Sequence, residues 1–234
     1  MKTALITGGS KGIGYGIAEA LLRENYGVAI TGRDKVTLNN AVGRLKKIAK
    51  GEVIGMVCDV RDYAAQQMVV QQILEAWKSL DVLVANAGVG HFAPIDEITL
   101  EQWQDTIDIN LTGAFYSIKA SLEALKKSRG YIITISSLAG TNFFATASAY
   151  NASKFGLTGF TQAAMLDLRK YGIKVSTIMP GSVATEFAGN SSSSLDESWK
   201  IQIEDIGQMV ADILRLNPRT LPSKIEVRPS LPAK

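Results

Sequence analysis

Short runs of apolar and β-branched residues alternate with longer helical segments along most of the 234-residue chain. Such runs, joined by helices, predict parallel strands that are buried on both faces of a sheet. We therefore expect an α/β fold in which residues 1–234 form one domain, a doubly wound parallel sheet with helices on both faces. The expected strands are Ala4–Thr7, Val28–Thr31, Val53–Val57, Val82–Ala85, Tyr131–Ser136 and Val175–Met179, and the expected helices include Ile13–Arg23, Ala64–Trp77, Leu111–Lys127 and Tyr150–Lys170.

A glycine-rich loop lies between the first expected strand and the first expected helix. Glycine permits a tight turn and a close approach of the backbone to a pyrophosphate, which the N–H groups at the helix start then face. The context predicts a Rossmann-type dinucleotide site, and the alternative is a glycine-rich turn without a ligand. The cofactor-binding residues expected here are Gly8, Ser10, Lys11, Gly12, Ile13 and Gly14.

The end of the second expected strand bears on the choice of cofactor. An NAD site needs a carboxylate about 20 residues past the glycines to accept hydrogen bonds from the ribose hydroxyls. Gly32 stands at that position and Arg33 follows it, so Arg33 and Lys11 are candidates to bind a 2′-phosphate. Asp34 is the competing candidate, and it would favour NAD if it pointed inward. We expect NADP(H) to be preferred over NAD(H).

Tyr150 and Lys154 are separated by one helical turn, so the phenol and the ammonium can share one cleft. A unit charge about 5 Å away is worth roughly 3 kcal/mol at an effective dielectric constant of about 20. The sequence therefore predicts that Lys154 lowers the pKa of Tyr150 by on the order of two units, into the range useful for acid–base chemistry. The alternative is a Tyr/Lys pair on a solvated helix face.

With the glycine loop and the Tyr-x-x-x-Lys pair, the chain resembles the short-chain dehydrogenase/reductase family of classical type. The resemblance runs from Thr3 to about Thr185, because several further motifs recur in order. These motifs are Asp59-Val60, Asn86-Ala87-Gly88, Asn110 within Asp108–Gly113, Ser137 within Ile135–Gly140, and Pro180-Gly181-Ser182-Val183-Ala184-Thr185.

The resemblance implies a role for each motif. Asn110, Ser137, Tyr150 and Lys154 are the expected catalytic residues, and Tyr150 and Lys154 are also expected to contact the cofactor. Asp59 and Val60 are expected at the adenine, and Asn86, Ala87 and Gly88 beside the cofactor. Around the nicotinamide, the expected residues are Pro180, Gly181, Val183 and Thr185.

Each motif residue also has a purely structural alternative. Ser136 or Ser137 could bond a turn amide, and Asn110 could be no more than a helix-terminal residue. Asp59 could cap the helix that follows it, and Thr185 could cap the next one. We favour Ser137 over Ser136 because the family register places it and because side chains alternate along a strand.

The reaction that the resemblance implies is NADP(H)-dependent interconversion of a small ketone or aldehyde and its alcohol, with Tyr150 as general acid and base. A 3-oxoacyl-(acyl-carrier-protein) reductase is the alternative, although this C-terminus lacks the Gly-Gly segment common in those enzymes. A non-catalytic dinucleotide-binding regulator is a further alternative. We disfavour it because Ser137, Tyr150 and Lys154 are all present. The family also implies a substrate lid at 186–200 and association as a homodimer or homotetramer.

Composition narrows the remaining function classes. The net charge is +3 with scattered basic residues, so nucleic-acid binding is not indicated. We expect no metal site, because His91 is the sole histidine, and no membrane span, because no apolar run approaches 18 residues. Cys58 is the sole cysteine, and we expect a buried side chain in a cytoplasmic protein. Four phenylalanines flank the expected active site as candidates for apolar walls or core: Phe92, Phe143, Phe144 and Phe187.

Overall fold

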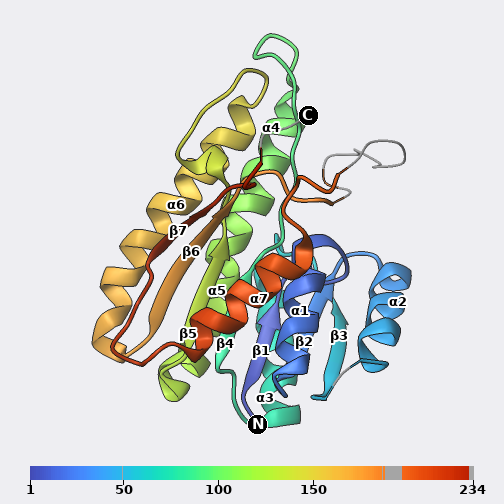
Figure 1. Ribbon diagram of the computed structural model, residues 1–234, viewed down its shortest axis with the longest axis vertical. Helices are drawn as coiled ribbons and strands as arrows, with labels where there is room; N and C mark the ends of the chain where they lie inside the picture. The colour runs from blue at the N-terminus through green and yellow to red at the C-terminus, as the bar shows by residue number, and fades with distance from the viewer. Residues whose placement is uncertain (49, 186, 188–196, 232–234) are drawn as a thin grey trace.

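The computed structural model describes residues 1–48, 50–185, 187 and 197–231. All strands assigned in this part belong to one parallel sheet with the order β3-β2-β1-β4-β5-β6-β7 (Figure 1). The doubly wound parallel sheet expected from the sequence is therefore confirmed. The strands are β1 (Thr3–Ile6), β2 (Gly27–Gly32), β3 (Val53–Val57), β4 (Val82–Ala85), β5 (Tyr131–Ile135), β6 (Lys174–Pro180) and β7 (Lys224–Val227).

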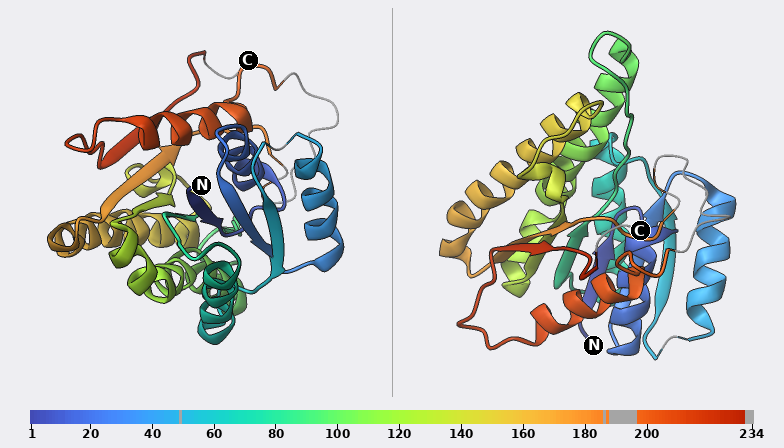
Figure 2. Two further views of the ribbon diagram at one scale, coloured as in Figure 1. Left: turned by 90° about the horizontal axis from the view of Figure 1, so that it is seen from below. Right: turned by 45° about the horizontal axis from the view of Figure 1, so that its top comes forward.

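Helices cover both faces of the sheet. One hydrophobic cluster joins the sheet to α1, α2 and α7, and a second joins it to α3, α5 and α6. Viewed from below, α1 and α7 lie together on one side of the strands, and the other group lies opposite (Figure 2). The α-helices are α1 (Gly12–Arg23), α2 (Lys35–Lys46), α3 (Tyr63–Trp77), α4 (Leu100–Ile107), α5 (Gly113–Ser128), α6 (Ser148–Leu168) and α7 (Ile203–Arg215).

The two clusters follow from the alternation of side chains along each strand. In β1, Ala4 and Ile6 join the cluster on the α1 side, whereas Leu5 joins the cluster on the α3 side. Because both faces are covered, every side chain of β1 is buried, and the strand reads in sequence as a continuous apolar run. Cys58 is also buried, as expected, and burial raises the pKa of its thiol to about 11.

Differences from the expected elements have local causes. The strand expected to end at Ser136 ends at Ile135, and the helix expected from Leu111 begins at Gly113 because a π-helical segment, η1 (Asp108–Thr112), precedes it. Strand β7 is not among the strands expected from the sequence. This strand lies at the sheet edge with alternate residues exposed, so its sequence shows no buried apolar run.

The strand order places a crevice next to β1. The chain passes from β1 to β2 on one side, and β4 pairs with β1 on the other. Connections therefore leave the carboxyl ends of β1 and β4 in opposite directions, which is where such sheets bind ligands. Nearly all the motifs identified in the sequence lie at this edge.

Two glycines allow α1 and α7 to pack closely. A Cβ built on Gly16 would lie 2.4 Å from the carbonyl oxygen of Ile203, and one built on Gly207 would lie 2.4 Å from that of Gly16. Both clashes are with backbone, which cannot move as the end of a flexible side chain can. The contact fixes the start of α1, and with it the glycine-rich loop.

We predict that Gly207→Ala lowers the free energy of unfolding by about 1–3 kcal/mol, as overpacking a tight contact does. Gly43→Ala is the matched control, because Gly43 is an exposed residue in α2 and no described atom lies within 4 Å of its built Cβ. That change should stabilise the protein by up to about 1 kcal/mol through helix propensity. Urea denaturation measures both, and equal effects would contradict the close packing.

Candidate active site

The glycine-rich loop is attached to the end of β4. The Asn86 side-chain amide donates to the carbonyl oxygens of Thr7 (2.9 Å) and Gly8 (3.1 Å). The Thr7 hydroxyl in turn accepts hydrogen bonds from the N–H groups of Asn86 and Ala87. Gly8 has a φ of +65°, and a Cβ on Gly14 would lie 2.5 Å from both Asn86 Nδ2 and the Gly8 oxygen. The loop therefore needs glycine at these positions.

The start of α1 fits an anionic group. Lys11 occupies the N-cap position in an extended conformation, and within the described chain its side chain makes no capping hydrogen bond. The first N–H groups of the helix, including that of Ile13, therefore point outward with the positive end of the helix dipole. A Cβ on Gly12 would lie 3.4 Å from Thr185 Cγ2, so the segment after β6 meets this loop.

The end of β2 lies against the same loop. A Cβ on Gly32 would lie 3.1 Å from Ser10 Oγ, so a larger side chain at residue 32 would displace Ser10. Arg33 is exposed and lies close enough to Asp59 to help lower the pKa of that carboxyl. Asp34 caps α2 by accepting hydrogen bonds from the Thr37 N–H (2.7 Å) and hydroxyl (2.6 Å). Its carboxylate is thus held by its own helix.

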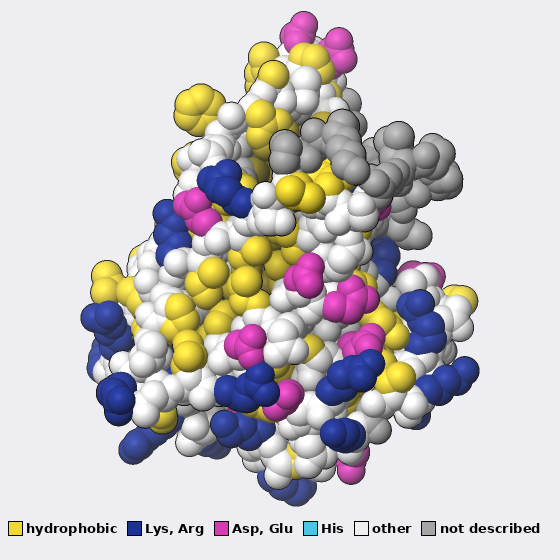
Figure 3. Space-filling view, in the orientation of Figure 1, with side chains coloured by type: hydrophobic (Ala, Val, Ile, Leu, Met, Phe, Trp, Pro, Cys, Tyr) yellow, Lys and Arg dark blue, Asp and Glu magenta, His cyan; other side chains and the backbone are white. Residues whose placement is uncertain are grey.

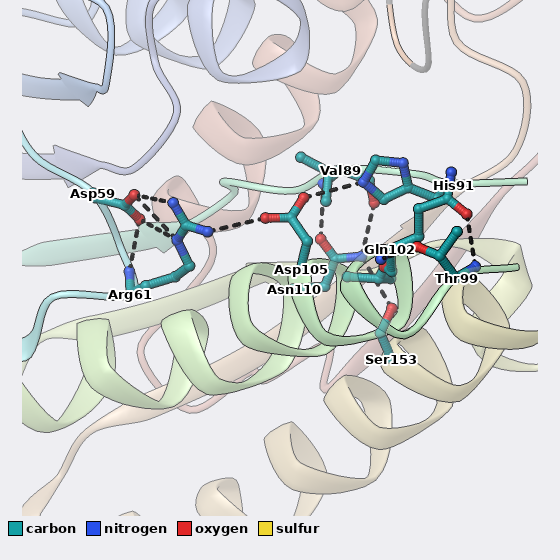
Figure 4. Close-up of polar contacts among 10 residues, drawn as sticks. Asp59, Arg61, Val89, His91, Thr99, Gln102, Asp105, Asn110 and Ser153 are labelled. Atoms are coloured by element: carbon teal, nitrogen blue, oxygen red, sulfur yellow. Dashed lines mark hydrogen bonds and ion pairs between the residues drawn. The ribbon is translucent and has the colours of Figure 1, made fainter.

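A chain of charged groups runs from Asp59 toward the loop after β4 (Figure 4). Arg61 binds both carboxylate oxygens of Asp59, at 2.6 Å to Oδ2, and its other branch binds Asp105 at 3.0 Å. The Arg61 hydrogen bonds hold the pKa of Asp59 below its usual value. The other carboxylate oxygen of Asp105, Oδ2, is within hydrogen-bond distance of His91 Nε2, at 3.1 Å. The helix that follows Asp59 is capped by Asp62, so the capping alternative for Asp59 is wrong.

The buried side chain of Asn110 is hydrogen-bonded to the loop after β4 (Figure 4). Its side chain accepts a hydrogen bond from the Val89 N–H at 2.8 Å and donates to the Val89 carbonyl at 2.9 Å. It also donates to the Ser153 hydroxyl at 3.0 Å. Asn110 lies inside η1 and not at a helix end, and such π-helical segments often occur at functional sites. A Cβ on Gly88 would lie 3.3 Å from Asn110 Oδ1 and 3.7 Å from the ammonium of Lys154.

The two serines after β5 point in different directions. Ser136 is buried and bonds to the Lys154 carbonyl and the Thr158 hydroxyl, so it serves packing. Ser137 is partly exposed, forms a hydrogen bond with Tyr150, and contacts the Pro180 carbonyl at 3.4 Å. Its oxygen also accepts a bond from the Ala139 N–H. The sequence-based preference for Ser137 is consistent with this arrangement.

Tyr150 and Lys154 lie on one face of α6, as their spacing predicts. The Lys154 ammonium is 5.7 Å from the centre of the Tyr150 ring and donates a 3.0 Å hydrogen bond to the Ile135 carbonyl. Lys154 is almost fully buried. The solvated-face alternative is therefore wrong.

Burial dominates the electrostatics of this pair. It raises the pKa of the Tyr150 phenol, and the hydrogen bond with Ser137 opposes that rise. Burial also lowers the pKa of Lys154 to about 8. The expectation that Lys154 lowers the pKa of Tyr150 by about two units is wrong for this structure, because removing the groups from water disfavours the charged form of each.

The segment after β6 runs from the sheet to the glycine-rich loop, where Thr185 meets Gly12. Gly181 donates from its N–H to the Val227 carbonyl, and Val183 pairs with Ile201 through a parallel bridge. Thr185 does not cap the next helix, since Gln202 occupies the N-cap of α7.

Val60 is buried against Gly113 at the start of α5. Most of the expected lid at 186–200 lies outside the described residues.

Sequence reasoning missed Arg61, Asp105, Thr7 and Asn151. Asn151 donates to the carbonyls of Ala139 and Asn142 and thereby holds the loop after β5 against α6. Its position next to Tyr150 was the available signal. The ion pair of Arg61 with Asp105 joins residues 44 positions apart in the chain, and no spacing in the sequence indicates it.

Neither a metal-binding cluster nor a membrane-spanning helix occurs among the described residues. The described residues contain no group of three or more His, Cys, Asp and Glu side chains placed to hold a metal ion. No helix in this part of the chain combines the length and hydropathy that crossing a membrane would require.

Known proteins are similar to this chain in sequence and in fold. The short chain dehydrogenase family model matches residues 2–196. A trans-4-hydroxycyclohexanecarboxylate dehydrogenase from Sinomonas cyclohexanicum is 35% identical over 195 residues, covering 79% of this chain and 73% of that protein.

Two solved structures superpose over nearly the whole chain. An alcohol dehydrogenase from Thermococcus sibiricus complexed with 5-hydroxy-NADP has a TM-score of 0.93 and 26% identity, covering 100% of this chain and 99% of that one. An actinorhodin polyketide ketoreductase with NADPH has a TM-score of 0.87 and 28% identity, covering 97% and 96%. Together with the sheet order, the glycine-rich loop and the clustered Ser137, Tyr150 and Lys154, these matches place the chain in the short-chain dehydrogenase/reductase family of oxidoreductases.

Proposed function

We propose that this oxidoreductase reduces an uncharged ketone or aldehyde to its alcohol with NADPH, and that Tyr150 supplies the proton. The observation that carries the proposal is the meeting of Ser137, Tyr150 and Lys154 at the carboxyl ends of β4 and β5. A raised pKa keeps the Tyr150 phenol protonated at neutral pH, as a proton donor must be.

Each of these residues has a distinct role in the proposed reaction. Ser137 donates a hydrogen bond to the carbonyl oxygen of the substrate and stabilises the charge that grows there. Tyr150 donates its proton to the same oxygen, and Lys154, through its ammonium, favours the phenolate that remains. Asn110 keeps the loop around Val89 in place beside them. When bound, the reduced nicotinamide supplies the hydride that the carbonyl carbon receives.

The cofactor site favours NADPH in this proposal. Gly8, Gly14 and the start of α1 would hold the pyrophosphate, and Arg33 with Lys11 would bind the 2′-phosphate. Asp34 is engaged as a helix cap, and so the carboxylate that would favour NAD is not directed at the ribose. Solved relatives bound to 5-hydroxy-NADP and NADPH support the same choice.

A 3-oxoacyl-(acyl-carrier-protein) reductase is the second candidate, supported by the likeness to a polyketide ketoreductase. That activity needs basic residues near the cleft to receive an acidic carrier protein. Residues 86–93, 132–153 and 175–185 contribute to the region around Tyr150 and contain no Lys or Arg, and the neighbouring Lys154 is buried. This composition favours a free small molecule over a carrier-bound substrate.

We also propose that copies of the chain associate through apolar helix faces. Phe115 is exposed on α5 and, with Ile118, Leu122 and Phe160, lines a shallow hollow against α6. A second hydrophobic region lies between β7 and α7, where Met209, Ile213 and Ile225 line a hollow (Figure 3). Two such faces suit a homotetramer, and covering one alone suits a homodimer.

We predict that Tyr150→Phe lowers kcat for ketone reduction by at least about 100-fold, because the proton donor is lost. The dissociation constant for NADPH should stay nearly unchanged. Steady-state NADPH oxidation and fluorescence titration measure the two effects. Tyr171→Phe, a change at an exposed tyrosine in the turn before β6, is the control. A Tyr150→Phe variant that keeps roughly a tenth of wild-type kcat would contradict the assignment.

Arg33→Asp should weaken NADPH binding about 10- to 100-fold, because a charge-assisted hydrogen bond is worth about 1.5–3 kcal/mol. NADH lacks the 2′-phosphate, so its affinity should change much less. Lys35→Asp makes the same change of charge two residues away at the start of α2 and controls for the overall field. Equal losses for the two cofactors would remove Arg33 from the phosphate site.

Burial of Lys154 predicts a pH dependence of stability in the cofactor-free protein. Its folded pKa, about 8, lies below the reference value of 10.5, so the unfolded state binds more protons between these values. The free energy of unfolding should therefore rise with pH across this window, by about 1.4 kcal/mol per pH unit.

Urea denaturation of wild type and Lys154→Met from about pH 7 to 9.5 measures this contribution, because the difference between the two proteins isolates residue 154. Wild type should gain on the order of 2 kcal/mol over the variant between about pH 8 and 9.5. Lys46→Met, a change at an exposed lysine in α2, should give no such trend. A difference independent of pH would mean that Lys154 is not desolvated.

A further inference from the structure

Aromatic rings lie around Tyr150 at the proposed active site. Phe92 meets the Tyr150 ring edge-on with centroids 5.4 Å apart, and Phe187 lies 5.7 Å from it. Phe144 stands 6.2 Å from Phe92 with the two planes inclined by only 32°. We call Phe92, Phe144 and Phe187 the aromatic wall.

The aromatic wall leaves apolar surface beside the proposed proton donor. Phe92 is 43% exposed and Phe144 is 52% exposed, so neither is an ordinary core residue. Phe143, next along the chain, is 85% exposed and makes no ring contact within the described residues, so it does not belong to the wall. Core packing therefore does not explain why Phe92 and Phe144 lie here.

Backbone hydrogen bonds hold the wall in place. The loops that carry Phe92 and Phe144 are joined by a parallel bridge between Ala93 and Ala147, with the Ala93 N–H donating to Thr146 at 2.8 Å. Asn151 donates to the carbonyl of Asn142 on the second loop at 2.8 Å. A preformed wall loses little freedom when a ligand binds.

Gly90 fits between two rings of the wall. A Cβ at this position would lie 2.7 Å from Phe187 Cε1 and 2.9 Å from Phe92 Cε2. Any larger residue would push the rings apart or into the space beside Tyr150. Gly90 therefore sets how much room the wall leaves.

The surroundings of the wall carry almost no charge. Residues 86–93, 132–153 and 175–185 contain no Lys, Arg, Asp or Glu, and His91 pairs with Asp105. Lys154 follows the second of these ranges, and its buried ammonium donates to the Ile135 carbonyl. A charged group packed against the wall would lose water without finding a counter-ion on these segments, which is costly.

We propose that the aromatic wall binds an uncharged aromatic or alicyclic ring attached to the reacting carbonyl, and that Gly90 sets the size of ring admitted. The proposal rests on the carbonyl reduction proposed above and names its substrate class. The ring packs against Phe92 and Phe144 while the carbonyl oxygen reaches Ser137 and Tyr150. Aromatic pairs at such distances are stabilising beyond the area they bury.

Three ketones test the proposal in NADPH oxidation assays: acetophenone, its charged analogue 4-acetylbenzoate, and the compact 2-butanone. Wild type should show a kcat/KM for acetophenone at least about tenfold above 2-butanone and about 100-fold above 4-acetylbenzoate. Phe92→Ala should lower kcat/KM for acetophenone about tenfold, mainly through KM, and leave kcat for 2-butanone within a factor of about three.

Matched variants separate specificity from general damage. Phe143→Ala removes a ring from the same loop as Phe144 and should change none of these ratios. Phe92→Leu should restore part of the acetophenone preference, and Gly90→Ala should reduce it with 2-butanone turnover retained. Equal loss on acetophenone and 2-butanone in Phe92→Ala would overturn the specificity role of the wall.

Ligand-observed NMR with NADP⁺ present distinguishes failure of this inference from failure of the proposed function. Acetophenone that binds wild type better than Phe92→Ala but is never reduced would support the wall and overturn carbonyl reduction. Turnover of 4-acetylbenzoate as fast as acetophenone would support carbonyl reduction and overturn the wall. Neither binding nor turnover of any ketone would overturn both.

Discussion

The hydrogen bonds from Asn86 to the carbonyls of Thr7 and Gly8 are the contacts on which the rest of the site depends. They join the ends of β1 and β4, the two neighbouring strands whose connections leave in opposite directions. A dinucleotide loop formed by β1 and a catalytic loop formed by β4 are thereby fixed relative to each other. Asn110 adds a second attachment by holding Val89 through two hydrogen bonds.

Burial has opposite effects on the pKa of the proposed donor and on that of its cationic neighbour. Tyr150 keeps its proton more tightly than a free phenol, and Lys154 gives up its charge more readily than a free amine. Placing the ammonium against the Ile135 carbonyl compensates part of the cost of burying it. A spacing of four residues identifies the pair but does not reveal how far each group is removed from water.

Much of the fold could be predicted because buried parallel strands leave a direct mark on sequence. Ala4 to Ile6 is apolar throughout since both faces are covered, whereas Lys224 to Val227 alternates and escaped detection. Motif residues such as Asn86 and Ser137 could be expected because the resemblance to the family places them at fixed points after β4 and β5. The ion pair of Arg61 with Asp105 could not, because it depends on how distant segments of the chain meet in space.

The tight contact between Gly16 and Gly207 also bears on how the protein is made. These residues lie near opposite ends of the chain, so α1 cannot bury its outer side until α7 has left the ribosome. Until then the apolar cluster that contains Ile17 and Leu21 lacks the members that α7 adds to it, Ile206 and Val210 among them. The amino-terminal half is therefore an incomplete folding unit during synthesis, and a nascent chain stopped short of α7 would present an apolar surface to chaperones and proteases.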